Sequence, residues 1–436
     1  MNACALGWSR RALIELQANK KWALNGGPFG SELVRRDYVD SGVPVIRGVN
    51  LSGDTRFNDN DFVFVSERKA DELRANNAQS GDVIFTQRGT LGQVGLIPHK
   101  ASFARYVISQ SQMKMTVDES LVLPEWIYYF FTAPLTVNEL VNKAFSSGVP
   151  HINLGILREL RVPVPPLPTQ LKICTILSAY DDLIENNLRR IEILEEMAQN
   201  LYREWFVRLR FPGHEGARMV DSPMGRIPEG WEAARIGSVA TICRGRSYRG
   251  SDLAEKGGVP FLNLKCIDRG GGFRYDGIKR YLGPFKQTQT ASVGDIIIAV
   301  TDVTQKRRLV AHAARVPVLD EPVSVLSMDL VRLSPAQTVA REYLYGMLRY
   351  SAFADEVKQH ANGVNVLHLN PERIATFEFV LPTPELVTRY STLCASLYQE
   401  CDILHLKNAN LRGTRDLLLP KLISGEVAVE SIGDGP

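Results

Sequence analysis

The sequence has few cysteines and no long apolar run. Six cysteines are spread over 436 residues, and none forms the Cys-x-x-Cys spacing typical of zinc sites. Cys394 and Cys401 are seven residues apart, which predicts two small apolar residues on one buried helix face. No stretch approaches the roughly 18 apolar residues of a membrane span, and the arginines near the start lie on the wrong side for a signal peptide. We therefore expect a cytoplasmic protein without a disulfide scaffold, zinc or membrane contact.

Familiar catalytic motifs are also missing. The sequence lacks Gly-x-Gly-x-x-Gly, a Walker lysine, His-Glu-x-x-His, Gly-x-Ser-x-Gly and the Asn-Pro-Pro-[Tyr/Phe] motif of amino-methyltransferases. Two Glu-x-Lys triplets, 67–69 and 356–358, lie in helix-like surroundings without an acidic partner on a strand, unlike a nuclease site. The prediction is a chain with no catalytic residues and no cofactor of its own. A methyltransferase or nuclease with unfamiliar motifs is the catalytic alternative.

Charge is balanced over the whole chain. There are 51 basic and 48 acidic residues, a net charge of +3, so total charge neither requires nor excludes an acidic partner such as DNA. The local distribution of basic residues has to decide.

Two segments, 173–205 and 390–422, repeat apolar residues in alternating steps of four and three. This seam is typical of helices that pair through one apolar stripe, and both segments far exceed the usual helix of about 11 or 12 residues. The polar exceptions are Asn187 in the first seam and Asn408 and Arg415 in the second. Single buried asparagines commonly fix the register of such a pair.

The residues predicted to form the helix and subunit interface are Ile173, Leu177, Tyr180, Ile184, Asn187, Ile191, Leu194, Leu201, Leu397, Leu404, Leu411 and Leu418. Charged residues between the seam positions, Asp181 and Glu185 among them, predict a solvated face on the first helix. A coiled-coil adaptor with two ligand-binding heads and no role on DNA is a second alternative.

Short motifs recur in the same order about half a chain apart. Gly7-Trp8 recurs as Gly230-Trp231, Gly42-Val43-Pro44 as Gly258-Val259-Pro260, Gly81-Asp82 as Gly294-Asp295, and Gly148-Val149 as Gly363-Val364. Because the offsets stay between 213 and 223, the sequence predicts a tandem duplication. Each half reads as an α+β globule with short strands, such as 61–65, 82–86 and 295–300, followed by a proline-rich exit and a long helix.

The predicted domains are two globular domains, 1–168 and 211–384, a central helix, 169–210, a distal helix, 385–424, and a tail, 425–436. The prolines at 163, 165, 166 and 168 predict that the central helix starts after the last of them.

In the first domain a glycine-rich loop, TQRGTLGQVG, follows the strand at 83–85. Arginine can bridge two acceptors of guanine and glutamine can pair with adenine, so Gln87 and Arg88 are base-reading residue types. A solvated hairpin is the alternative interpretation of the same loop. The DNA-contact residues predicted in this half are Arg47, Gln87, Arg88, Thr90, Ser147 and His151.

The second domain has two basic clusters. CRGRSYRGS places three arginines around a tyrosine, and TQKRRL places three cations in a row, as phosphate contact requires. The alternative is a solvated charged face. The DNA-contact residues predicted here are Arg244, Arg246, Tyr248, Arg249, Lys306, Arg307, Arg308 and Asn365.

The chain resembles the specificity subunits of type I restriction-modification enzymes over nearly its whole length. The resemblance is strongest in PLPTQLKICTIL, DDLIENNLRRIEILEEMAQNLYREWF, TRDLLLPKLISGE and GDVIFTQRGTLGQVG. It implies two target recognition domains, held apart by an antiparallel pair of helices, that each read half of a split double-stranded DNA target. It also implies two kinds of partner. Two methyltransferase subunits carry S-adenosylmethionine, and restriction subunits act as motors and nucleases that need ATP and Mg²⁺, in defence against foreign DNA.

Overall fold

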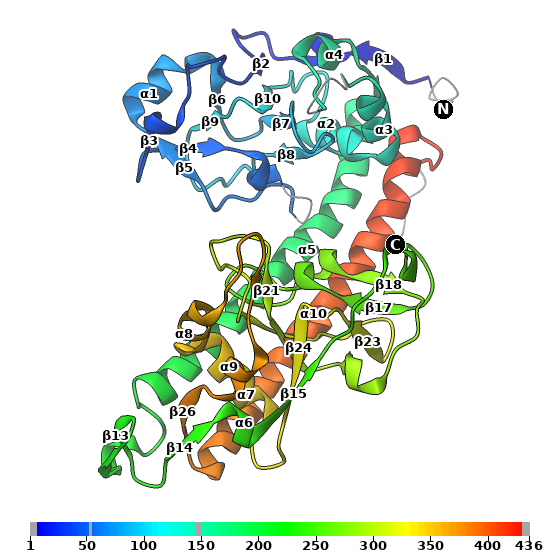
Figure 1. Ribbon diagram of the computed structural model, residues 1–436. Helices are drawn as coiled ribbons and strands as arrows, with labels where there is room; N and C mark the ends of the chain where they lie inside the picture. The colour runs from blue at the N-terminus through cyan, green and yellow to red at the C-terminus, as the bar shows by residue number, and fades with distance from the viewer. Residues whose placement is uncertain (1–6, 52–54, 145–149, 430–436) are drawn as a thin grey trace, which may run out of the picture. The chain divides into compact units, whose positions relative to one another are not determined.

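The computed structural model describes residues 7–51, 55–144 and 150–429, which divide into two compact units (Figure 1). Unit 1 takes the described residues of Met1–Asn187 and Lys407–Pro436, and unit 2 is Leu188–Leu406. The two long helices, α5 (Leu167–Tyr202) and α10 (Pro384–Ser424), each contribute residues to both units. The sequence-based domain boundaries stay a prediction.

Unit 1 mixes short strands with short helices. Its strands are β1 (Ser9–Ala12), β2 (Leu24–Gly26), β3 (Tyr38–Val39), β4 (Val43–Ile46), β5 (Val63–Val65), β6 (Asn77–Ala78), β7 (Val83–Thr86), β8 (Val94–Leu96), β9 (Tyr106–Ile108), β10 (Gln112–Met115) and β11 (Arg161–Val164). Its shorter helices are α1 (Glu67–Glu72), α2 (Pro124–Thr132), α3 (Pro134–Asn142) and α4 (Leu154–Glu159). Proline occupies the first position of α2 and α3, where its missing N–H is not needed.

Unit 2 also mixes short strands with short helices. Its strands are β12 (Met219–Ser222), β13 (Gly225–Pro228), β14 (Glu232–Arg235), β15 (Ala240–Arg244), β16 (Leu253–Ala254), β17 (Val259–Leu262), β18 (Lys279–Tyr281), β19 (Thr290–Ser292), β20 (Ile296–Ala299), β21 (Thr301–Asp302), β22 (Ala313–Arg315), β23 (Val323–Leu326), β24 (Leu330–Pro335), β25 (Leu367–His368) and β26 (Glu378–Leu381). Its shorter helices are α6 (Ile236–Val239), α7 (Arg341–Tyr350), α8 (Phe353–Val357) and α9 (Pro371–Ala375).

The sheets of the two units have the same topology. Unit 1 has a four-stranded sheet in the order β2-β10-β7-β8 and a five-stranded sheet in the order β3-β5-β4-β9-β6. Unit 2 has β15-β24-β20-β22 and β16-β18-β17-β23-β19, which correspond strand by strand. Even the parallel pairing inside the larger sheet recurs, as β4 with β9 and as β17 with β23. The predicted α+β class and internal duplication are therefore confirmed.

The repeated Gly-Asp motif marks a turn before a buried strand. Gly81 and Gly294 both have a positive φ, which glycine adopts without strain. Asp82 accepts a hydrogen bond from the amide of Gln79, and Asp295 accepts one from that of Ser292. The predicted strands at 82–86 and 295–300 appear as β7 and β20, one or two residues shorter.

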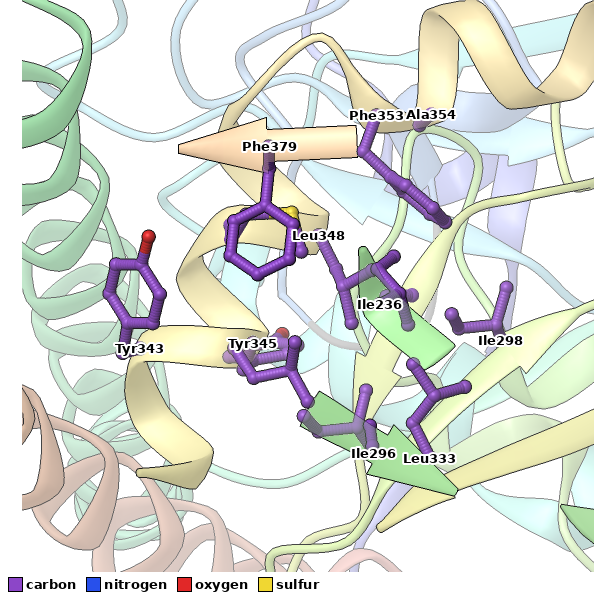
Figure 2. Close-up of a cluster of buried hydrophobic side chains, with 14 of the residues drawn as sticks. Ile236, Ile296, Ile298, Leu333, Tyr343, Tyr345, Leu348, Phe353, Ala354 and Phe379 are labelled. Atoms are coloured by element: carbon purple, nitrogen blue, oxygen red, sulfur yellow. The ribbon is translucent and has the colours of Figure 1, made fainter. Parts of the chain in front are cut away.

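Each unit has its own hydrophobic core. In unit 1 the indole N–H of Trp126, fully buried on α2, donates to the carbonyl of Pro163, so the proline-rich exit is tied to the core. In unit 2, side chains from β20, β24, α7, α8 and β26 meet in one cluster (Figure 2). Burial of each large apolar side chain contributes about 1.5–3 kcal/mol, so each core can stabilise its own unit.

The long helices pair through the predicted seam and run in opposite directions (Figure 1). Asn187 faces Asn408 within unit 1, and Ile191 packs with Cys401 and Leu404 within unit 2. Cys401 is buried, as its spacing from Cys394 predicts.

The structure corrects two predictions about the long helices. Helix α5 starts at Leu167, so Pro168 lies inside its first turn, where proline is tolerated. Asp181, predicted on the solvated face, is buried, and it accepts hydrogen bonds from the Tyr129 hydroxyl at 2.7 Å and from Arg415 at 2.5 Å. Arg415 explains this burial, because it supplies the opposite charge from the partner helix.

Candidate DNA-recognition surfaces

In unit 1 several loops leave the sheets at one edge. The turn 109–111 between β9 and β10 lies at the centre of this edge. The end of β4 lies beside the turn, where the Ser109 amide donates to the Ile46 carbonyl at 2.9 Å. Gln87, which follows β7, donates its amide to the Ser111 carbonyl at 2.7 Å. We call this edge the first loop edge; its segments are 27–34, 47–50, 87–93, 109–111 and His151.

Three predicted DNA-contact residues meet on this edge. The Gln87 carbonyl accepts a hydrogen bond from the Ile152 amide at 3.0 Å, and Arg88 forms a β-bridge with His151. Arg88 is exposed, and so is Thr90 at the tip of the glycine-rich turn. The loop between β7 and β8 thus offers side chains outward while its main chain is fixed from both sides.

Arg47 follows β4 on the same edge, and its guanidinium contacts a main-chain carbonyl. It donates from Nη2 to the Asp61 carbonyl at 2.8 Å, and its main-chain amide donates to Asn50. Its side chain therefore supports the loop in this state. Ser147, the remaining prediction in this half, lies outside the described residues, as do Ser146 and the Gly148-Val149 repeat.

Sequence reasoning missed the segment 27–34. A Cβ atom at Gly27 would lie 2.1 Å from the Ser109 carbonyl oxygen, so only glycine allows this close approach. The side-chain amide of Gln110 holds the segment by donating to the Leu33 carbonyl at 2.9 Å. At its tip Phe29 is 88% exposed, an aromatic surface suited to stacking or apolar contact. The Gly-Ser repeat within this segment and its counterpart, Gly30-Ser31 and Gly250-Ser251, was the available signal.

Unit 2 builds the equivalent edge with the same hydrogen bonds. The Ser327 amide donates to the Leu262 carbonyl at 2.8 Å, as Ser109 does to Ile46, and the Leu369 amide donates to Val300 at 2.8 Å, as Ile152 does to Gln87. A Cβ atom at Gly245 would lie 2.1 Å from the Ser327 carbonyl oxygen, repeating the geometry of unit 1. The segments of this second loop edge are 245–252, 300–308, 327–329 and 362–368.

The predicted arginine and tyrosine cluster begins with Arg244, the last residue of β15, and continues onto the second loop edge. The Arg244 side chain donates to the Met328 carbonyl at 3.1 Å, and the Arg246 guanidinium lies over the Tyr281 ring at 5.5 Å. Tyr248 packs its ring edge against Phe261, and Arg249 is exposed. The cluster presents cations on a framework of aromatic rings.

The second basic cluster lies in the loop after β21. Lys306 and Arg308 are exposed, whereas Arg307 has φ +50° and donates from its guanidinium to Gln359 at 2.8 Å. Gln305 donates to the Val364 carbonyl at 2.7 Å, which brings this loop against the exposed segment of Asn365.

A buried carboxylate organises that loop. Asp302 is fully buried and accepts hydrogen bonds from the amides of Thr304 and Leu309, both at 2.8 Å. Burial alone raises the pKa of a carboxyl, but these amides, with the Thr304 hydroxyl, hold the pKa of Asp302 below its usual value.

His368, which the sequence analysis did not select, holds in unit 2 the position that His151 holds in unit 1: His151 forms a bridge with Arg88, and His368 pairs with Thr301. Both histidines are followed by an apolar residue and an asparagine, Asn153 or Asn370, that caps a short helix. The segment between the Gly-Val repeat and His368 is two residues longer than the one before His151, so the Gly-Val match alone does not bring His368 opposite His151.

Six of the predicted interface residues are buried: Ile173, Leu177, Ile184, Asn187, Ile191 and Leu404. The other six are half-buried: Tyr180, Leu194, Leu201, Leu397, Leu411 and Leu418. Sequence reasoning missed the ion pairs that join each globular part to its helix. Arg56 binds Glu185 on α5, with Nη2 at 2.7 Å, and Arg315 binds Asp402 on α10, with Nη1 at 3.1 Å. Within the described residues no cluster of three or more His, Cys, Asp or Glu is placed to hold a metal ion, and no helix there is long and apolar enough to cross a membrane.

Comparison with known proteins shows which family this chain belongs to. The profile of the type I restriction modification DNA specificity domain matches residues 35–196 and 228–386. The MjaIX specificity subunit of Methanocaldococcus jannaschii is 24% identical over 376 residues, 84% of this chain and 82% of that protein. The HindI specificity subunit of Haemophilus influenzae is 22% identical over 419 residues, 80% of this chain and 87% of that protein.

A crystal structure of the type I restriction-modification S subunit from M. genitalium has the same fold, with a TM-score of 0.55 at 16% identity over 95% of this chain and 96% of that one. Because the family profile covers well over half of the sequence in two copies, this chain belongs to the type I restriction-modification DNA specificity family.

Proposed function

We propose that each unit reads one half of a bipartite, asymmetric DNA target through its loop edge, and that the paired helices fix the number of unread base pairs between the halves. One observation carries this proposal: the two edges have the same main-chain framework but different side chains. Gln87 and Arg88 occupy the position where unit 2 has Val300 and Thr301. A shared main-chain framework that presents different side chains suits the recognition of two different half-sites.

The two edges also differ in the type of contact they offer. The first presents Arg88 and the exposed Phe29, whereas the second presents Arg249, Lys306 and Arg308. Cations in this number suit phosphate oxygens, while a single arginine beside a glutamine suits base edges.

Methyltransferase subunits are the partners that we propose for the helices, two per chain. Apolar side chains remain exposed on α5 at Leu171, Leu183 and Met197 and on α10 at Leu406 and Leu417. Exposed apolar residues on helices whose seam is already filled favour a docking role. We propose that the methyltransferase subunits bind S-adenosylmethionine and that restriction subunits bind ATP and Mg²⁺. We also propose that this chain is not catalytic and acts in the cytoplasm.

Sequencing of methylated bases in a host that expresses this chain with its methyltransferase subunits tests the proposal. The expected result is one split motif with two different half-sites and a gap of constant length. Methylation or cleavage by the purified single chain would make it an enzyme. A chain without salt-sensitive DNA binding in the presence of the methyltransferase would be an adaptor unrelated to DNA.

A further inference from the structure

The two long helices are copies of each other, yet their polar seam residues are not. Every seam position of α5 corresponds to the seam position 217 residues later in α10, from Ile173 and Tyr390 to Trp205 and Leu422. Under this correspondence Asn187 matches Leu404, and Ile191 matches Asn408. The copied helices therefore carry their asparagines at different seam positions.

The asparagines meet because the pairing is between unlike helices. Asn187 and Asn408 are both buried, and the Asn187 side-chain amide donates to the Asn408 side-chain oxygen at 2.8 Å. The Asn408 amide also reaches the Ile184 carbonyl at 3.3 Å. At the corresponding layer in unit 2, Ile191 packs with Leu404 in an apolar cluster.

A second polar pair shows the same asymmetry. Asp181 and Arg415 form a largely buried ion pair in unit 1. The residues that correspond to them are Tyr398 and Ala198, both of which lie in the apolar core of unit 2. One layer of the helix pair is thus ionic and its counterpart is apolar.

Pairing of like helices would break both polar pairs. If α5 met a second copy of itself in the same antiparallel arrangement, Asn187 would face Ile191 and Asp181 would face Ala198. If α10 met its own copy, Asn408 would face Leu404. Each mismatch would occur twice, and a buried amide or carboxylate without its partner is strongly unfavourable.

We propose that these two buried polar pairs make the helix of each half select the helix of the other half and reject a second copy of itself. A single polar pair is known to set partner choice in coiled coils, because the mismatched alternatives are penalised. The device matters during synthesis, when α5 is complete and its apolar seam is exposed before α10 exists. Each molecule then keeps one loop edge of each kind.

The test uses the folded full chain with a protease site inserted after Gly216, which is exposed and has open space around it. Two batches of protein that carry tags of different mass are cut and mixed. The cut halves are dissociated in urea, allowed to associate again by dilution, and analysed by native mass spectrometry. The wild type is expected to give unlike pairs only. Variants N187L/N408I and D181A/R415A should each admit like pairs, and the combination of all four substitutions should approach random pairing, with about half of the pairs alike.

The matched control moves the asparagine pair without removing it. The variant N187I/I191N/L404N/N408L keeps the same composition and transfers the facing asparagines to positions 191 and 404, while like pairs still put asparagine against isoleucine or leucine. It should retain unlike pairing at the wild-type level. Like pairs at the random fraction in the wild type, or exclusively unlike pairs after removal of both polar pairs, would overturn the proposal.

The stability of the uncut chain gives a second test, which also applies to variants whose cut halves do not stay together. N408I alone leaves Asn187 buried against an apolar side chain, which is the mismatch that a like pair would contain. The folding equilibrium constant should fall about tenfold or more in N187L and in N408I, and should recover in the double variant. Single variants as stable as the double variant would mean that the mismatch carries no penalty, and the proposal would fail.

Discussion

Arg315, at the end of β22, forms a largely buried ion pair with Asp402 on α10, and this pair occupies the helix position that corresponds to the Arg56–Glu185 pair on α5. Both halves therefore anchor the globular part to the helix with an arginine from a different part of the sheet framework. The equivalent carboxylates, Glu185 and Asp402, are 217 residues apart.

Removal of Arg315 should strand the buried Asp402 carboxylate. We expect R315A to lower the free energy of unfolding by about 3 kcal/mol at neutral pH, and R315L/D402L to lower it less, because no charge is left unpaired. Urea denaturation measures both. Equal losses in the single and double variants would contradict an ion-pair anchor.

The deficit of R315A should depend on pH. Burial raises the pKa of Asp402, and Arg315 opposes that rise. Without Arg315 the pKa rises further, so stability is retained at acid pH, where the carboxyl is protonated, and is lost as pH rises through the raised value. The difference between wild type and R315A should therefore widen as pH rises above about 4, the ordinary pKa of an aspartate.

Arg88 should determine bases in one half-site. We expect R88Q to change the methylated motif in that half-site alone, because a bidentate contact to guanine is worth about 1–3 kcal/mol of discrimination. R68A, at an exposed arginine on α1, is the control and should leave the motif unchanged. A uniform loss of methylation across all sequences would indicate that Arg88 contacts the backbone.

Lys306 and Arg308 should contact phosphates. The double variant K306A/R308A should bind DNA more weakly by a similar factor for all sequences, and the slope of log K against log salt should become shallower by about 0.9 for each lost contact. Arg307 is left in place because it binds Gln359. R226A, on the separate β12–β13 hairpin, is the control. An altered half-site with the original slope would make these residues base readers.

Asp302 should stabilise its loop only when ionised. We expect D302N to lower the free energy of unfolding by about 2–3 kcal/mol at neutral pH through the lost charge-assisted hydrogen bonds. Because the folded state has the lower pKa, this contribution is present above the ordinary value near about 4 and is lost as pH falls through the lowered pKa. Wild type and variant should converge in acid. A difference that stays constant down to about pH 2 would exclude this origin.

The gap of the target should follow the length of the helices. One heptad inserted after Asn187 in α5 and one after Leu406 in α10, both at the boundary between the units, keeps both seams in phase and leaves the side-chain contacts within each unit intact. Each helix gains about 10 Å, which corresponds to roughly three base pairs at about 3.4 Å per pair. The methylated motif should show the same half-sites with a longer gap. An unchanged gap would show that the helices do not set the spacing.

The heptad seams were predictable because the spacing of apolar residues shows them directly, and the duplication because short motifs recur in the same order. The burial of Asp181 was not, since it depends on Arg415, which is remote in the chain and becomes a neighbour only when the helices pair. The ion pair between Arg56 and Glu185 was hidden for the same reason.

On the loop edges, residue types pointed to Gln87 and Arg88, but their meeting with His151 depends on hydrogen bonds across the chain. His368 was missed because a loop two residues longer displaced the repeat. Phe29 was missed because its exposure follows from how Gly27 packs on the Ser109 carbonyl, which no local pattern encodes.

The loop edges are fastened to their sheets largely by main-chain atoms: the amide and carbonyl groups of Ser109 and Gln87 in one half, and of Ser327 and Val300 in the other. Every residue type carries these groups, so the side chains that point outward are released from the task of holding the fold together. Mutation at these positions can explore new target sequences while the protein stays folded, which is the freedom that an evolutionary contest with changing foreign DNA would favour.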